Sequence, residues 1–147
     1  MLAAPSTGAD VALVLDYATT PENIERISSF TSSIIDGLDI SPSGVHVALI
    51  TYGANATTVF DFNALQGSQV NRDEAKKLVS TAIPMPDRPR IDKALQVADR
   101  ELFTTEAGSR PGVPKVMISV LSSAVSLLKD KNINRHLIQT TFYFIVA

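Results

Sequence analysis

Cysteine is absent from this chain of 147 residues. Its absence excludes disulfides, thiolate metal sites and a cysteine nucleophile, although it does not fix the cellular compartment. Long apolar runs are also missing, because no segment reaches the roughly 20 residues that a membrane helix needs. The formal net charge is -2, so there is no electrostatic reason to expect nucleic acid or an anionic membrane as a partner.

The beginning of the sequence has neither the positively charged n-region nor the long apolar h-region of a secretory signal peptide. As written, the chain is typical of a cytoplasmic protein or of a piece of something longer. Its composition is ordinary for one globular domain, with 45% hydrophobic and 19% charged residues, and its length suffices for a real core. No internal repeat or linker divides residues 1–147.

Short apolar runs alternate with helical patterns along the chain. Nearly continuous apolar runs, typical of strands covered on both faces, occupy residues 10–17, 45–53 and 115–123, and a further apolar run occupies residues 140–147. Helical spacing of apolar side chains is found in residues 20–38, 71–83, 91–102 and 124–131. Residues 55–62 follow the second run after a very short connection, so they are expected to pair antiparallel with it. This order predicts a mostly parallel sheet with one antiparallel edge strand and with helices on both faces.

Two polar residues stand where buried strands of this sheet are expected to end. Asp16 closes the first apolar run, and Ser122 closes a later one. In open parallel sheets, ligands bind beyond the carboxyl ends of the strands. A carboxylate at the end of a buried strand is costly unless something binds it. Thr20 or Thr19 can cap the helix that follows Asp16, so the expected functional surface begins at this turn.

Four stretches in order carry a resemblance over nearly the whole chain. They are "ADVALVLDYATT", "LDISPSGVHVALITYG", the strand pair around "GANA", and "IDKALQVADRELFTTEAGSRPGVPKVMISVLSS". On these the sequence resembles a von Willebrand factor type A (vWA) domain of the extracellular matrix and adhesion kind. The resemblance implies a three-layer, Rossmann-like α/β fold. It also implies that the final strand and helix of the family are missing after residue 147, which would leave residues 142–146 as an exposed apolar edge prone to aggregation.

The family has a metal-ion-dependent adhesion site, in which oxygen ligands from three loops hold magnesium or calcium. Its pattern is Asp-x-Ser-x-Ser, a threonine before a later helix, and an aspartate after a later strand. Asp16 stands in the first place and Thr20 can substitute for the second serine, but Ala18 replaces the first serine. Pro89 aligns with the threonine, unless the loop shifts by a residue, and Ser122 replaces the later aspartate. The resemblance therefore implies a vestigial site at Asp16, Thr20 and Ser122, with no metal and no other cofactor expected.

An empty site leaves Asp16 in need of another partner. Arg88 or Arg90, in the loop expected to face it, could make a charge-assisted hydrogen bond with the carboxylate. We expect Asp16, Thr20, Arg88, Arg90 and Ser122 to rim the binding surface. Asn55 begins the triplet Asn-Ala-Thr, an acceptor sequence for N-glycosylation in a predicted tight turn.

Nothing in the sequence indicates an enzyme. His46 is interpreted as a strand-surface residue, and neither it nor His136 has neighbours at the spacing of metal ligands or a catalytic base. Ser122 lacks the Gly-x-Ser-x-Gly elbow of a hydrolase nucleophile, and the glycines form no phosphate-binding or dinucleotide pattern.

The resemblance implies a non-enzymatic, extracellular protein-binding module that contacts other matrix proteins, collagens among them, without a metal ion. Two alternatives stay open on the sequence alone. One is a structural spacer and self-association unit of a multi-domain matrix protein. The other is an intracellular vWA scaffold in a protein complex, which the absence of a signal peptide and of cysteine permits.

Overall fold

The structure is a computed structural model that describes residues 8–64, 69–80, 88–121 and 140–146. Its five strands are β1 (Ala9–Asp16), β2 (Val45–Tyr52), β3 (Ala56–Phe60), β4 (Lys115–Leu121) and β5 (Thr140–Val146). They form one sheet in the order β3-β2-β1-β4-β5. β1 pairs parallel with β2 and β4, β4 pairs parallel with β5, and β3 runs antiparallel to β2. The predicted mostly parallel sheet with one antiparallel edge strand is confirmed.

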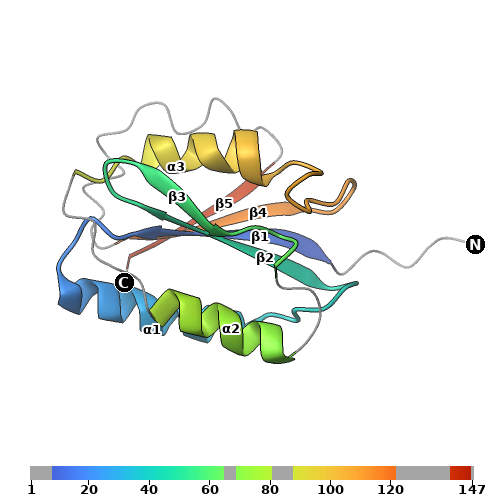
Figure 1. Ribbon diagram of the computed structural model, residues 1–147, viewed down its shortest axis with the longest axis horizontal. Coiled ribbons are helices and arrows are strands. Elements are labelled where there is room, and N and C mark those ends of the chain that lie inside the picture. The colour runs from blue at the N-terminus through green and yellow to red at the C-terminus, as the bar shows by residue number, and fades with distance from the viewer. Residues whose placement is uncertain (1–7, 65–68, 81–87, 122–139, 147) are drawn as a thin grey trace, which may run out of the picture.

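Helices cover both faces of this sheet (Figure 1). α1 (Pro21–Gly37) and α2 (Gln69–Ser80) lie on one face, and α3 (Ile91–Val97) lies on the other. The three-layer architecture expected from the resemblance is therefore present. No helix in the described part of the chain combines the length and the apolar character that a membrane crossing requires.

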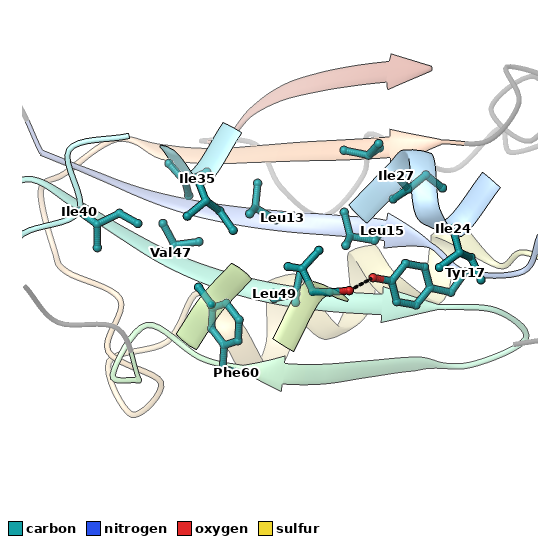
Figure 2. Packing of buried hydrophobic residues seen from close by; sticks show 14 residues of the cluster. Leu13, Leu15, Tyr17, Ile24, Ile27, Ile35, Ile40, Val47, Leu49 and Phe60 are labelled. Carbon is teal, nitrogen blue, oxygen red and sulfur yellow. Dashed lines mark hydrogen bonds between the residues drawn. The ribbon is translucent and has the colours of Figure 1, made fainter. Parts of the chain in front are cut away.

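α1 forms where the sequence supplies both a cap and an apolar stripe. Thr20 is the N-cap and its hydroxyl oxygen accepts a hydrogen bond from the backbone N–H of Asn23 at 3.3 Å, while Pro21 occupies the first turn. The side chains that recur at helical spacing are buried against the sheet: Ile24, Ile27, Thr31 and Ile35. Figure 2 shows the isoleucines of this set packed over Leu13 and Leu15 of β1.

The other face of β1 supports a second core. Ala12 and Val14 point to the α3 side and pack with Ile91 and Leu95 of α3. Because successive strand side chains alternate between faces, one central strand supplies both cores. Every β1 residue from Asp10 to Asp16 is buried.

The helix predicted over residues 91–102 changes its geometry near its end. α3 stops at Val97 and continues as the π-helical turn η1 (Ala98–Leu102), in which the backbone N–H of Phe103 donates to the carbonyl of Ala98 at 2.8 Å. Ala98 and Leu102, which belong to the apolar spacing of the predicted helix, are both buried. Apolar spacing does not separate an α-helix from a helix that ends in one π-turn, so the sequence could not indicate this change.

The interpretation of His46 as a strand-surface residue is wrong. Its exposed fraction is 5%, and its Nε2 lies 3.1 Å from the carbonyl oxygen of Pro42. β2 is an interior strand of a sheet with helices on both faces, so no position on it faces solvent in the way the interpretation required. The predicted helix at 124–131 and His136 lie outside the described residues, and the expected aggregation of the β5 edge stays a prediction.

Candidate functional site

Asp16 is the last residue of β1 and is completely buried. Its register partner is Tyr52, the last residue of β2, and the backbone N–H of Tyr17 donates to the carbonyl of Tyr52 at 2.9 Å. Asp16 Oδ1 accepts a hydrogen bond from the backbone N–H of Ala18 at 3.0 Å. The carboxylate therefore stabilises the turn that leads from β1 towards α1, at the carboxyl edge of the sheet.

Tyr52 places a buried phenol beside this carboxylate. Its side chain is 0% exposed, and its hydroxyl has no hydrogen-bond partner among the described residues. Burial, and after it the charge of Asp16, raises the pKa of Tyr52 well above its ordinary value of 10.0. Both effects disfavour the phenolate. The phenol is therefore neutral at physiological pH.

Thr20 lies on the exposed side of the same turn. Its hydroxyl oxygen is engaged as the cap of α1, and the hydroxyl oxygen of Thr19 accepts a hydrogen bond from the Asn23 side chain at 2.9 Å. The sequence left open which threonine caps the helix, and the structure assigns the role to Thr20. Both hydroxyls thus hold the start of α1 in place.

The loop before α3 reaches the same edge. The backbone N–H of Arg90 donates to the carbonyl of Gly53, directly after β2, at 2.8 Å. Figure 1 shows α1 and α3 both beginning at this end of the sheet. Arg88 is exposed here, and the Arg90 guanidinium donates to both carboxylate oxygens of Asp92 at 2.8 and 2.6 Å. These hydrogen bonds hold the pKa of Asp92 below its usual value.

The structure thus brings four of the five predicted rim residues, or their loops, to one edge, with Asp16 beneath the surface and three side chains exposed. Ser122 follows the end of β4 at Leu121 and lies outside the described residues. Pairing of Arg88 or Arg90 with Asp16 stays a prediction. The pairing of Arg90 with Asp92 was missed, although two opposite charges separated by one residue are visible in the sequence.

Comparisons with known proteins place this geometry in a family. Residues 10–139 match the von Willebrand factor type A domain. The chain belongs to this family. Integrin alpha-2 from Bos taurus is 32% identical over 112 residues, and matrilin-3 from Homo sapiens is 31% identical over 116 residues. Each alignment covers 76% of this chain, but 9% of the integrin and 23% of the matrilin. The vWA chain therefore spans less than a quarter of either relative.

A solved structure shares the fold. Proximal thread matrix protein 1 from the mussel byssus superimposes with a TM-score of 0.76 at 16% identity, covering 96% of this chain and 38% of that one. Another structure of that protein, with a TM-score of 0.74 and 21% identity, has zinc in its metal-ion-dependent adhesion site. At such low identity the likeness establishes the vWA fold, and the metal is a property of the mussel protein.

The described residues of this vWA domain do not complete such a metal site. Ala18 and Pro89 supply no side-chain oxygen, Asp16 Oδ1 accepts a backbone N–H, and Thr20 caps a helix. Hard cations such as magnesium need several oxygen ligands with more negative charge than one carboxylate provides. No group of three or more His, Cys, Asp or Glu side chains in the described ranges could hold a metal ion. The described residues therefore supply fewer oxygen donors than the family's cation takes.

A second buried aspartate was not recognised from the sequence of this vWA domain. Asp10, 0% exposed near the start of β1, accepts hydrogen bonds from the Ser109 hydroxyl, from the backbone and side chain of Arg110, and from Lys115 Nζ, at 2.7 to 3.1 Å. Arg110 also donates to the carbonyls of Ala9 and Gly44. Burial alone raises the pKa of Asp10, but the bonds from Lys115 and Arg110 outweigh it, so the pKa lies below its ordinary value. The sequence offered one indication of this buried charge, because Asp10 stands at the start of an apolar run.

Proposed function

We propose that this vWA domain is a non-enzymatic protein-binding module of an extracellular matrix or cell-adhesion protein. Its membership of the family and its similarity to an integrin and a matrilin support this proposal. The same similarity supports an extracellular location. Collagens are among the candidate partners, as the resemblance to matrix vWA domains implies.

The proposal includes binding without a metal ion. The donor set at the carboxyl edge supports it, because Ala18 stands in the place of one family ligand and Pro89 aligns with another unless the loop shifts by a residue. In the family the cation receives an acidic residue of the partner. Here Arg88 is exposed at the same edge, and a guanidinium forms strong charge-assisted bonds with carboxylates. We infer that Arg88 receives the acidic group of the partner in place of the cation.

Surface plasmon resonance on immobilised fibrillar collagen tests both statements. The expected dissociation constant is the same in magnesium and in EDTA. Arg88→Glu is expected to weaken binding at least about tenfold, as loss of a charge pair in an interface does. Arg26→Glu, the same change at an exposed position of α1, is the matched control and should bind normally. Binding lost in EDTA would overturn metal independence, equal weakening by both variants would overturn the role of Arg88, and absence of binding would remove collagen as the partner.

Calorimetry with magnesium tests the donor argument itself. The natural chain is expected to give no binding isotherm. A variant with Ala18→Ser, Pro89→Thr and Ser122→Asp restores the ligand types of the family and is expected to bind magnesium. A 1:1 micromolar isotherm for the natural chain that Asp16→Ala abolishes would refute the proposal.

A self-associating spacer is the second candidate, and one observation favours it. In the described sheet β5 lies at an edge, with β4 as its hydrogen-bonded neighbour. The outer backbone groups of an edge strand can pair with another chain. Light scattering at increasing concentration separates the candidates, because a spacer unit grows in mass while a binding module stays at one mass.

A further inference from the structure

Asn55 lies in the connection between β2 and β3. The backbone N–H of Gly53 donates to the carbonyl of Asn55 at 2.9 Å, which closes the turn and leaves the Asn55 side chain exposed. Thr57, two residues further on, is exposed as well. The triplet Asn55–Ala56–Thr57 is the single Asn-x-Ser/Thr sequence in the chain. Both side chains that define an N-glycosylation acceptor thus face solvent.

A shallow depression adjoins Asn55. Its volume is about 220 Å³, and its walls come from the turn and from one side of α3 and η1: Asn55, Ala56, Lys93, Gln96, Val97, Arg100 and Glu101. This is smaller than the roughly 300–1,000 Å³ pockets that enclose drug-sized ligands, and it suits one sugar ring lying on the surface. Its lining combines two small apolar side chains with amide, cationic and carboxylate groups. Such a lining complements a sugar that has hydroxyls and an acetamide methyl.

We propose that Asn55 carries an N-linked glycan whose first N-acetylglucosamine lies in this depression. In the transfer, the Asn55 side-chain nitrogen displaces the pyrophosphate from the anomeric carbon of a lipid-pyrophosphate-linked oligosaccharide and loses a proton. A nitrogen–carbon bond forms, and the lipid pyrophosphate leaves. The inference rests on the proposed function in one respect, since a chain meets this donor along the secretory route.

The position has a structural consequence for the sheet. Asn55 immediately precedes β3, and in the sheet formed by the described strands β3 lies at an edge, paired with β2. Edge strands are protected in folded proteins by charges, bulges or covering groups. A glycan at the start of β3 covers this edge against pairing with a second chain. The sugar is thereby assigned both a docking site and a protective role.

Occupancy is tested with the 147-residue chain secreted from cultured cells behind an added leader peptide. Intact mass before and after peptide-N-glycosidase treatment is expected to show one glycan. Asn55→Gln and Thr57→Ala are expected to abolish it by two independent changes, while Thr57→Ser, which keeps the acceptor sequence, retains it. An unmodified mass for the secreted natural chain overturns the proposal. Because the leader is supplied, this failure leaves the binding proposal untouched.

Docking is tested by trimming. Glycans of the high-mannose type are cut by endoglycosidase H to a single N-acetylglucosamine, and thermal unfolding is compared with the Asn55→Gln chain. We expect the single sugar to raise the melting temperature by about 2–4 °C. The double variant Gln96→Ala with Arg100→Ala should lose this increment, and Lys77→Ala, an exposed change on α2, should keep it. An increment of zero, or one that survives the double variant, overturns docking in the depression.

Discussion

The two ends of β1 each bury an aspartate on the same side of the sheet, and they hold it differently. Asp10 is surrounded by Ser109, Arg110 and Lys115, which lie about a hundred residues further along the chain. Asp16 accepts the N–H of Ala18, two residues away. At the amino end the carboxylate joins distant segments through two cations, whereas at the carboxyl end the described bond is local.

This difference distinguishes the amino end of the sheet, which acts as a rigid support, from the loops at its carboxyl end. Arg110 ties the start of β1 to Gly44, directly before β2, so the amino end is cross-linked by charge. At the carboxyl end, the described bonds of the Asp16 carboxylate and the Thr20 hydroxyl reach two or three residues along the chain, and the loop before α3 is joined to the end of β2 through the backbone. A longer-range bond runs from the Tyr17 hydroxyl to the carbonyl of Val79. Changes at positions such as Ala18 and Pro89 are therefore expected to leave the sheet intact, because loops on a rigid support vary without disrupting it.

The largest expected effect is that of Asp10→Asn. Arg110 and Lys115 have side chains only 22% and 20% exposed, and losing their counter-charge should lower the free energy of unfolding by about 3 kcal/mol. The pKa of Asp10 is lowered from 3.8 in the folded chain. The contribution of the ionised Asp10 to stability is therefore complete above 3.8, the ordinary pKa that applies to the unfolded chain. It is lost as the pH falls through the lower pKa of the folded chain. Urea unfolding at pH 7 and pH 3 should show a smaller acid sensitivity in the variant, and a loss below 1 kcal/mol at pH 7 would contradict the prediction.

The same substitution at the other end sharpens the contrast. Asp16→Asn is expected to cost at most half as much, about 1.5 kcal/mol, because the amide oxygen can still accept the N–H of Ala18. Burying a neutral amide also costs less than burying a carboxylate. Urea unfolding of both variants in one buffer makes the comparison. Equal losses of the free energy of unfolding would contradict the prediction, because they would show that the two carboxylates stabilise the fold to the same extent.

Two buried tyrosines give a matched pair of smaller changes. The Tyr17 hydroxyl donates to the carbonyl of Val79 at 3.2 Å, the dashed line in Figure 2, so Tyr17→Phe should cost about 1 kcal/mol. Tyr52→Phe removes a buried hydroxyl without a described partner and should be neutral or stabilising. Burial raises the pKa of both phenols. With respect to these two phenols, the folded natural chain therefore keeps its full stability below pH 10 and loses stability as the pH rises beyond it. Each variant lacks one of these phenols, so its free energy of unfolding should fall less between pH 7 and alkaline pH than that of the natural chain.

The smallest effect is expected at the surface ion pair of Lys76 and Asp36. Its atoms are 2.9 Å apart, but the side chains are 34% and 54% exposed. Asp36→Asn should change the free energy of unfolding by less than about 0.5 kcal/mol, and 1 M salt should cancel the difference. A loss comparable to that of Asp10→Asn would mean that burial does not determine how much an ion pair contributes to the free energy of unfolding in this fold.

The layers of this fold were predictable because the evidence for them is local. The apolar run of β1, the cap at Thr20 and the stripe through Ile24 and Ile27 each depend on neighbours in sequence. The position of Asp16 at the carboxyl edge followed from the same pattern. The π-turn after Val97 did not, because the spacing of apolar residues fits both helical forms.

The missed contacts depend on distance in space. Nothing in the neighbourhood of Asp10 in sequence indicates Arg110 or Lys115, since the sheet must form before they meet. The error at His46 has a different cause, because the apolar run over residues 45–53 already predicted a strand covered on both faces, and the polar character of one side chain was given more weight than that pattern. The local pair of Arg90 and Asp92 was accessible to sequence reasoning and was overlooked in favour of Asp16.

The central place of β1 governs how the chain is synthesised. Its first neighbour β2 follows soon after it, but its second neighbour β4 begins at Lys115, some 55 residues after β3 ends at Phe60. At about 5–20 residues per second on the ribosome, that interval lasts roughly 3–11 s. During these seconds the edge of β1 that later pairs with β4 is open in the nascent chain.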